Sequence, residues 1–374
     1  MSKSILIGNG INIAFSKNDD YKNYAIIERF TKYLSTDRYD DVFNYSISAS
    51  ELGAMLNELN DFFQTRLMNI TALRLAENEE EMKTLIDISQ RYHSKSKDLL
   101  SVGIEDYFFV MKMVFNLCGD EETPLNALYD GLKYLFLDSI YNDGKIETLY
   151  QSMDKYAQEL KKYDTILTVN YDNNLNKIAD KPVYHLHGSY EVLDDTYIPE
   201  TINGFLAQQK ENPPIIIDTK KHLYCNGIMA YSGKRKKEII DTYKNGNFAL
   251  DNLLPRIKNK NDIEAQTKFL QLKNSTNEKE FETYKIFEAA LKNPALRCTE
   301  YPLDKLLEIS GELHILGMSP NNDSHIFDAI NDNDKITKVV YFAAGNDDVV
   351  SAQKIIQKKI EIQNVFKYWE KLGI

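Results

Sequence analysis

Cysteine is scarce in this sequence of 374 residues, where Cys118, Cys225 and Cys298 are odd in number and lie far apart. Because no Cys-x-x-Cys pair is present, we expect neither a disulfide framework nor a zinc ribbon. The chain also lacks the run of about twenty apolar residues that a membrane span requires, and its N-terminus lacks the small-residue cleavage site of a signal peptide. These absences predict a soluble protein of a reducing compartment, the cytoplasm, with no membrane partner.

Basic residues are also few relative to acidic ones: 45 Lys and Arg and 56 Asp and Glu give a net charge of -11. Binding to a phosphate backbone is driven by the release of counterions to a basic surface. We therefore expect no nucleic-acid partner. The hydrophobic share of 43% and charged share of 27% are those of an ordinary globular protein.

Proline is missing from the whole region before Pro124. In that region, segments such as 23–34 and 51–67 repeat apolar residues every three or four positions, which is typical of amphipathic helices. We expect a helical insertion there, at about 21–146. A second, mixed insertion is expected at about 191–294, where an Asn-Gly turn and a basic run interrupt the helical stretches.

Strands are predicted from short apolar or β-branched runs at 4–7, 163–169, 183–186, 312–316 and 336–342. Helices are expected at 323–330 and, at the C-terminus, at 349–369. This alternation of strand and helix implies a parallel sheet. The expected fold class is α/β, a Rossmann-like parallel sheet with helices on both faces. Its core would come from about 1–20, 147–190 and 295–374.

The first candidate site is the loop Gly8-Asn9-Gly10-Ile11-Asn12, which follows the first predicted strand. Glycines at this position let the backbone approach a pyrophosphate, and the next helix offers unpaired N–H groups. Only two glycines of a G-x-G-x-x-G pattern are present, since Ile13 takes the third place. A turn whose glycines are needed only for positive φ is an equally good interpretation of these residues.

The second candidate is the pair Asn170 and Asp172, at the carboxyl end of the strand predicted at 163–169. Ligands of open α/β sheets bind at this end. An amide and a carboxylate side by side can orient a carboxamide or a ribose. The alternative is structural, with Asn170 in a turn and Asp172 capping a helix.

His187 is the third candidate, in the segment His185-Leu186-His187-Gly188-Ser189. A histidine beside a glycine at a strand end is suited to be a general base near neutral pH. His185 is expected to be structural. No carboxylate or cysteine stands at close ligand spacing to these histidines, so we expect no metal.

The fourth candidate is the turn that follows the strand predicted at 312–316. Gly317 and Ser319 would allow contact with a phosphate or ribose. Asp323 is expected to cap the next helix, and binding of a hydroxyl is the alternative. The segment 227–235 is not a phosphate-binding P-loop, because its glycine spacing is one residue too long and Arg235 follows Lys234. The basic run Lys234–Lys237 is expected to be a solvated helix start.

Taken in order, the segments ILIGNGIN, TVNYDNNL, HLHGS and LGMSPNNDSHIFDAI resemble the sirtuin-like domain of bacterial antiphage proteins and the related abortive-infection proteins of the AbiH type. The resemblance covers the expected sheet and leaves both insertions unmatched. Sirtuin deacetylases carry a four-cysteine zinc module that three scattered cysteines cannot form, so peptide deacetylation is disfavoured. Asn9 also replaces the alanine usual in sirtuins, which favours the defence branch.

The resemblance implies that NAD is bound as a substrate, and it assigns roles to the candidate residues. The loop with Gly8, Asn9, Gly10 and Asn12 would surround the pyrophosphate and nicotinamide ribose. Asn170 and Asp172 would hold the nicotinamide end and a water, and His187 would be the catalytic histidine. Gly317 and Ser319 would contact the adenosine side.

The function implied by the resemblance is hydrolysis of NAD to nicotinamide and ADP-ribose by an abortive-infection effector. Its expected partners are further copies of the same chain, as a homo-oligomer, or a defence or phage trigger protein. The main alternative is a nucleotide or ADP-ribose sensor, or an ADP-ribosyl transferase, that uses the same pocket. A structural or toxin-neutralising protein with a vestigial pocket is a further alternative.

Overall fold

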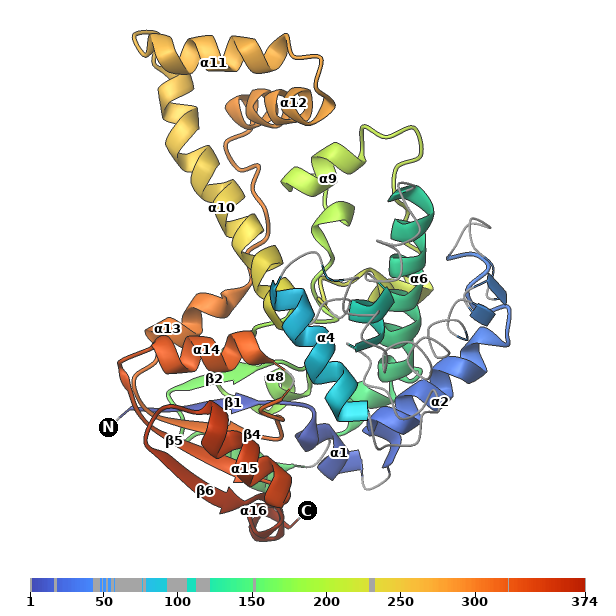
Figure 1. Ribbon diagram of the computed structural model, residues 1–374, viewed down its shortest axis with the longest axis vertical. Coiled ribbons are helices and arrows are strands. Elements are labelled where there is room, and N and C mark those ends of the chain that lie inside the picture. Colours follow the sequence, from blue (N-terminus) through green and yellow to red (C-terminus); the bar gives the residue numbers. More distant parts are fainter. Residues whose placement is uncertain are drawn as a thin grey trace.

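A six-stranded parallel sheet forms the centre of the computed structural model (Figure 1). The structure describes residues 2–16, 19–42, 79–92, 106–111, 122–150, 153–228, 233–321 and 323–373, and a few single positions between 48 and 76. The strands are β1 (Lys3–Ile7), β2 (Thr165–Thr168), β3 (Val183–His185), β4 (Gly311–Leu316), β5 (Ile336–Ala343) and β6 (Ile360–Asn364), in the order β3-β2-β1-β4-β5-β6. All five pairings are parallel. The α/β Rossmann-like fold class is confirmed.

Side chains alternate between the two faces of the sheet along each buried strand. Both faces therefore carry apolar residues, and helices cover both. Ile5 and Ile7 of β1 face one hydrophobic core, and Leu6 between them faces another. The first core receives side chains from α1 (Gly10–Ser16), α7 (Asp154–Leu160), α8 (Asn174–Ile178) and α16 (Val365–Leu372). The second receives them from α13 (Lys305–Glu308), α14 (Ser324–Asp332) and α15 (Asn346–Ile355).

The C-terminal segment differs from the sequence-based prediction of one helix at 349–369, which is wrong. Helix α15 ends at Ile355, strand β6 follows, and α16 closes the chain. Ile360 and Ile362 are half-buried and alternate with exposed Glu361 and Gln363, the period of an edge strand. With only two apolar residues, that alternation is too short to separate from a helical spacing, and pairing with β5 decides the outcome.

The first insertion is helical where the structure describes it. Its main helices are α2 (Asn23–Leu34), α4 (Glu79–Tyr92) and α6 (Glu122–Tyr141). The predicted helix at 23–34 is confirmed, whereas most of the one at 51–67 lies outside the described residues. Phe30 of α2 stacks on Phe136 of α6 at 4.5 Å between ring centroids. This pair lies in a core of its own, separate from those of the sheet.

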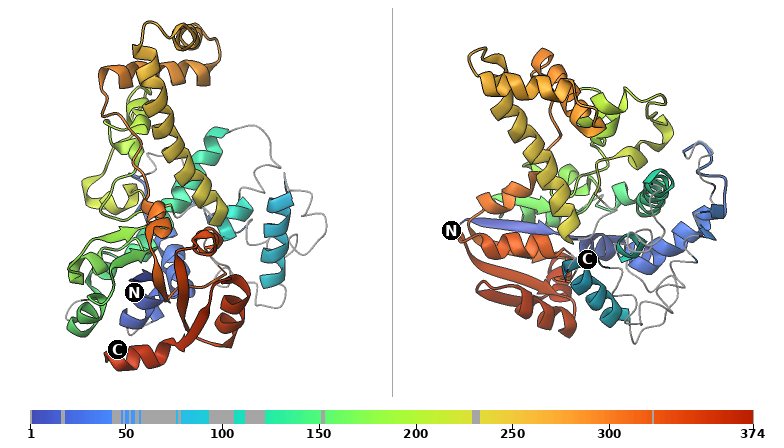
Figure 2. Two further views of the ribbon diagram at one scale, coloured as in Figure 1. Left: turned by 90° about the vertical axis from the view of Figure 1, so that its left-hand side faces the viewer. Right: turned by 45° about the horizontal axis from the view of Figure 1, so that its top comes forward.

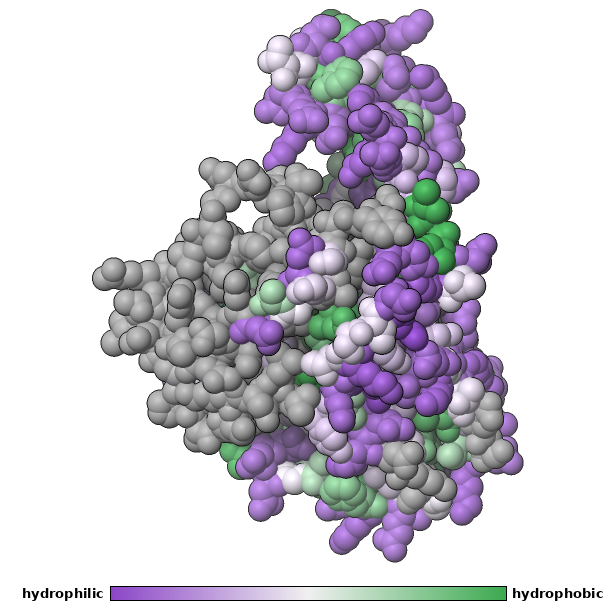
Figure 3. All heavy atoms as spheres, turned by 90° about the vertical axis from the view of Figure 1, so that its right-hand side faces the viewer, coloured by the Kyte–Doolittle hydropathy of each residue, from purple (hydrophilic) through white to green (hydrophobic). Residues whose placement is uncertain are grey.

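The second insertion extends away from the sheet along one long helix (Figures 1 and 2). Helix α10 (Gly233–Lys258) begins beside α14 and carries a head made of α11 (Ile263–Lys273) and α12 (Glu278–Lys292), and α9 (Ile202–Ala207) packs on α12. The described face of this head in Figure 3 is mainly hydrophilic. Short 3-10 helices are η1 (Asp19–Tyr21), η5 (Lys145–Thr148), η6 (Asp195–Tyr197), η7 (Asp218–Tyr224) and η8 (Pro302–Asp304). No helix in the described part of the chain is long and apolar enough to cross a membrane.

Glu312 of β4 contacts three side chains of the sheet. We expect these contacts to make a contribution to stability that is lost in acid. It contacts His314 at 2.7 Å, Lys3 at 3.0 Å and Lys338 at 3.1 Å. The hydrogen bond from His314 and the two lysines lower the pKa of Glu312 to about 2. A carboxyl whose folded pKa is depressed stabilises the fold above its unfolded pKa and loses that effect as the pH falls through the folded value.

We expect Glu312→Gln to lower the free energy of unfolding at pH 7 by about 1 kcal/mol, a small value because Lys3 and Lys338 are partly exposed. The difference from the unsubstituted chain should shrink between pH 4.5 and pH 2. Urea denaturation at several pH values measures it. A difference that stays constant down to pH 2 would contradict the assignment.

Candidate functional site

The sheet order reverses direction between β1 and β4, and the loops after these two strands pack tightly on each other. The Gly8 N–H donates to the Leu316 carbonyl at 2.9 Å, and the Gly10 N–H donates to the Gly317 carbonyl at 2.7 Å. A Cβ on Gly10 would come within 2.6 Å of the Gly317 Cα, and one on Gly8 within 2.7 Å of the Gly317 oxygen. Only glycine fits at this crossing.

These contacts explain the glycines of the first loop differently from either interpretation of the sequence. Neither Gly8 nor Gly10 has positive φ, whereas Gly317 has φ of 68°. The interpretation that the first loop needs glycine for positive φ is therefore wrong, and it is the neighbouring Gly317 that has this conformation. Since the amides of Gly8 and Gly10 are bonded to the β4 loop, a pyrophosphate could reach them only after those bonds open.

Gly317 lets us predict a large effect of a single methyl group. Alanine there would be strained at φ of 68° and would bring its Cβ to 2.8 Å from the Ile11 nitrogen. We expect Gly317→Ala to lower the free energy of unfolding by about 1–3 kcal/mol. The matched control is Gly345→Ala, because Gly345 has an extended backbone and no heavy atom within 4 Å of an added Cβ. Thermal melting of both variants measures the effect, and equal shifts would contradict it.

Asn12 and Asp172 lie together, although 160 residues separate them in the chain. The Asn12 side-chain N–H donates to an Asp172 carboxylate oxygen at 2.7 Å, and Tyr150 donates its hydroxyl to the Asn12 oxygen at 2.7 Å. The other Asp172 oxygen accepts from the Asn174 side chain at 2.7 Å. Burial raises the pKa of Asp172, and the hydrogen bond from Asn12 opposes this rise. Asn9 adds a weaker link, since its oxygen accepts from Asn12 at 3.4 Å.

Asn170 lies at the carboxyl end of β2, between the first loop and His185. Its side-chain N–H donates to the Gly8 carbonyl at 3.4 Å. Its backbone carbonyl contacts Nδ1 of His185 at 2.9 Å, and the other nitrogen of that ring contacts Asn176 at 2.8 Å. Both ring nitrogens of His185 are thus used, one on the loop after β2 and the other on α8, as they would be in a structural histidine. Asn170 is buried.

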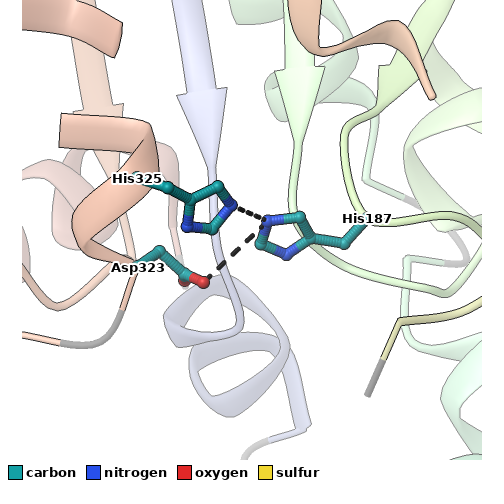
Figure 4. A group of neighbouring side chains, drawn as sticks. All are labelled: His187, Asp323 and His325. Carbon is teal, nitrogen blue, oxygen red and sulfur yellow. Dashed lines mark hydrogen bonds and ion pairs between the residues drawn. The ribbon is translucent and has the colours of Figure 1, made fainter. Parts of the chain in front are cut away.

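His187 contacts residues that arrive from the other half of the sheet (Figure 4). Its Nε2 lies 3.0 Å from Nε2 of His325 and 3.9 Å from a carboxylate oxygen of Asp323. The same Asp323 oxygen lies 3.4 Å from Nζ of Lys236, near the start of α10. We call His187, Asp323 and His325 the histidine cluster.

The histidine cluster spans the carboxyl edge of the sheet. His187 follows β3, whereas Asp323 and His325 follow β4, and the strands β2 and β1 lie between them. Neighbouring strands are about 4.8 Å apart, so the two strand ends are about 14 Å apart. Side chains that touch across this distance must lean over the ends of β1 and β2. The cluster therefore lies above the point where the strand order reverses.

Burial and Lys236 set the charges of the histidine cluster. Burial lowers the pKa of His187 well below its usual value, and Lys236 lowers it further. Burial also lowers the pKa of His325, to about 4. Burial raises the pKa of Asp323, but Lys236, His187 and His325 together outweigh this effect and hold the pKa below the usual range. At neutral pH an ion pair of Lys236 and Asp323 therefore lies beside two neutral imidazoles, one of which donates its Nε2 hydrogen to the other.

No protein-family model, curated protein or solved structure matches this chain. The sirtuin-like resemblance therefore depends on the four sequence segments alone.

Sequence reasoning singled out His187, but it gave Asp323 another role and did not consider His325 or the contact of Lys236 with the histidine cluster. Asp323 occupies the N-cap position of α14, but its side chain caps no N–H of that helix, so the capping prediction is wrong. Lys236 is buried rather than solvated, while Lys237 lies at the surface and contacts Asp241 as predicted for a solvated run. His325 drew no attention, yet the Asp-x-His sequence at the start of the helix that follows β4 is a signal that could have found it.

The remaining candidate, Ser319, lies in the loop after β4 and is partly exposed. Its hydroxyl accepts a long hydrogen bond from the Asn321 N–H at 3.4 Å. This weak bond leaves the hydroxyl free to turn toward another group. Of the candidates from the sequence, the first loop therefore contacts Asn170, Asp172 and Gly317 directly, and His187 belongs to the neighbouring histidine cluster.

Proposed function

We propose that this protein binds NAD at the carboxyl edge of β1 and β4 and hydrolyses it to nicotinamide and ADP-ribose. The strand order β3-β2-β1-β4-β5-β6 supports this, because dinucleotides bind Rossmann folds at the point where this order reverses. The observation that carries the proposal is the convergence of four loops there. Asn12 bonds to Asp172, Gly10 packs on Gly317, and His187 meets the residues after β4.

The proposed reaction requires few catalytic groups from the protein. Nicotinamide leaves readily because its pyridinium charge is neutralised, so the enzyme must stabilise a cationic ribose and orient a water. His187 is neutral at physiological pH, the form that accepts a proton from that water or a ribose hydroxyl. Asn170 would orient the carboxamide through its side-chain amide, and Asp172 would oppose the positive charge on the ribose.

The residues proposed for chemistry are closed off from solvent, which makes opening part of the proposed reaction. Asn170, Asp172 and His187 are at most 6% exposed. NAD could reach them only if segments above the carboxyl edge move. Many enzymes gate their sites in this way. The expected triggers, self-assembly or a defence or phage protein, would act by favouring the open state.

Incubating the full chain with NAD and quantifying the products tests the proposal. We expect nicotinamide and ADP-ribose to appear in equal amounts as NAD disappears. Mass spectrometry of the protein in the same mixture separates hydrolysis from ADP-ribosyl transfer, because a transferase leaves an ADP-ribosyl mass on an acceptor. Release of nicotinamide with no free ADP-ribose would therefore contradict hydrolysis.

The bonded amides of Gly8 and Gly10 favour a second candidate, a sensor that binds NAD or ADP-ribose without cleaving it. Binding to a sensor would be coupled to opening of the contact with Gly317. Calorimetry with NAD and with ADP-ribose, followed by recovery of the ligand, distinguishes the two. Tight binding with intact NAD after long incubation favours the sensor.

The biological role that follows from hydrolysis is depletion of cellular NAD. The resemblance to antiphage proteins is the ground for placing this in an infected bacterium, where loss of NAD would stop phage production together with the host. Expression of the active protein should then lower NAD in cells only when its trigger is present.

A further inference from the structure

We propose that His187, Asp323 and His325 form a binding site for one divalent transition-metal ion of the Zn²⁺ and Co²⁺ class. In the sequence, no carboxylate or cysteine stands at close ligand spacing to His185 and His187. Asp323 supplies that carboxylate from the far side of β1, 136 residues later in the chain than His187. This site does not depend on the proposed NAD chemistry.

The positions of the three ligand atoms fit one ion. They lie within 4.8 Å of one another, with 3.0 Å between the two Nε2 atoms and 3.9 Å from His187 Nε2 to the Asp323 oxygen. Ligands of a tetrahedral Zn²⁺ ion, at about 2.0–2.2 Å from the metal, lie about 3.4 Å apart. Shifts of well under 1 Å in each of the two quoted distances bring them to this value. Figure 4 shows the three side chains pointing toward a common centre.

The ligand types select the class of metal. Two imidazoles and one carboxylate suit Zn²⁺, Co²⁺ or Fe²⁺, whereas Mg²⁺ and Ca²⁺ prefer oxygen alone. Three protein ligands leave one position for water, as in catalytic zinc sites. Binding requires both rings to carry their proton on Nδ1, so the proton that now joins the two Nε2 atoms moves to a ring Nδ1 and no oxidant or reductant is needed.

Two features of the histidine cluster favour a further ligand. The side chains of His187 and His325 are almost completely buried, yet their Nε2 atoms are hydrogen-bonded to each other. Nδ1 of His325 is also buried and has no hydrogen-bond partner among the residues that the structure describes. Buried polar atoms without partners cost about 1–3 kcal/mol each and often mark an absent water or ion.

Lys236 supplies a test that a merely structural cluster would not pass. Its Nζ lies 3.4 Å from the same Asp323 oxygen, so it orients the carboxylate but repels a cation. Replacing it by methionine removes the charge and keeps most of the buried volume. If the histidine cluster is a metal site, the Lys236→Met variant should bind the ion more tightly than the unsubstituted chain, by about tenfold or more.

The experiment titrates the full chain, freed of metal by a chelator and carrying no histidine tag, with Co²⁺ and with Zn²⁺. We expect one ion per chain, with the strong visible absorption of four-coordinate Co²⁺. His325→Ala and Asp323→Asn should weaken binding by at least about 100-fold, because each removes a ligand. Lys236→Met should strengthen it.

His314→Gln is the matched control, because Glu312 and His314 form another acid-x-His pair in which no second histidine takes part. It should leave the affinity unchanged. The proposal is overturned if the unsubstituted chain binds no ion, if His314→Gln weakens binding as much as His325→Ala, or if Lys236→Met weakens it. Tighter binding by Lys236→Met cannot come from misfolding.

Metal binding and NAD hydrolysis would compete for Nε2 of His187. Added Zn²⁺ is therefore expected to inhibit nicotinamide release in the unsubstituted chain. Because the titration contains no NAD, a chain that binds Co²⁺ but leaves NAD intact refutes the proposed hydrolysis alone. A chain that hydrolyses NAD and binds no metal refutes this inference alone.

Discussion

Replacing His187 by alanine is expected to lower the rate of nicotinamide release by about 10²- to 10⁴-fold, the usual contribution of a general base. Burial lowers the pKa of His187 and keeps its imidazole neutral, the form with a nitrogen lone pair that can accept a proton. Asn170→Ala should also abolish release by losing the amide that orients the carboxamide. Nicotinamide quantified over time measures both rates.

The control for these variants is a histidine of the same sheet that lies outside the site. His314 in β4 bonds to Tyr163 and Glu312 at 2.9 and 2.7 Å. His314→Ala should disturb the sheet without touching the chemistry, so its turnover should remain close to that of the unsubstituted chain. Thermal melting identifies any variant that is unfolded. Full turnover by both His187→Ala and Asn170→Ala would show that the site is assigned wrongly.

The sheet could be predicted largely from the sequence because its central strands are buried on both faces. Short runs such as 4–7 and 312–316 contain apolar residues on both sides of the strand, as parallel strands between two helical layers must. The edge strand β6 was missed because only one of its faces packs on the protein. Its register comes from hydrogen bonds to β5, which no local pattern encodes.

Candidate residues were found in the sequence where polar residues come soon after a predicted strand. The resemblance implied that Asn12 and Asp172 lie in the same pocket, and their side chains are hydrogen-bonded. Lys236 follows no strand, and it reaches Asp323 only because α10 of the second insertion begins beside α14. Contacts of this kind depend on the docking of whole elements. They cannot be found from the composition of a basic run.

Substitution of Asp138 by asparagine is expected to lower the free energy of unfolding by about 3–5 kcal/mol, the cost of breaking a buried ion pair. This carboxylate of α6 is buried and accepts from Arg38 at 2.5 and 2.9 Å, from Tyr39 at 2.6 Å and from His222 at 2.7 Å. Burial raises the pKa of Asp138, but these donors outweigh it and hold the pKa well below its usual value. Asparagine would replace one acceptor oxygen by an N–H donor in a site where Arg38, Tyr39 and His222 all donate.

A neighbouring carboxylate on the same arginine provides the comparison. Asp143 contacts Arg38 at 2.9 Å but its side chain is 58% exposed. Asp143→Asn should therefore cost at most about 1 kcal/mol. Urea denaturation of both variants at pH 7 measures the difference, and a cost below 1 kcal/mol for Asp138→Asn would contradict the prediction.

The position of Asp138 determines what its loss would do to the rest of the molecule. Arg38 and Tyr39 follow α2 in the first insertion, whereas His222 belongs to η7 in the second. The Asp138 carboxylate therefore joins the two insertions directly. We expect Asp138→Asn to loosen them together, so hydrogen exchange should rise in both α2 and η7 while the strands β1 and β4 stay protected. Exchange that rises only near α2 would mean that other contacts hold η7 in place.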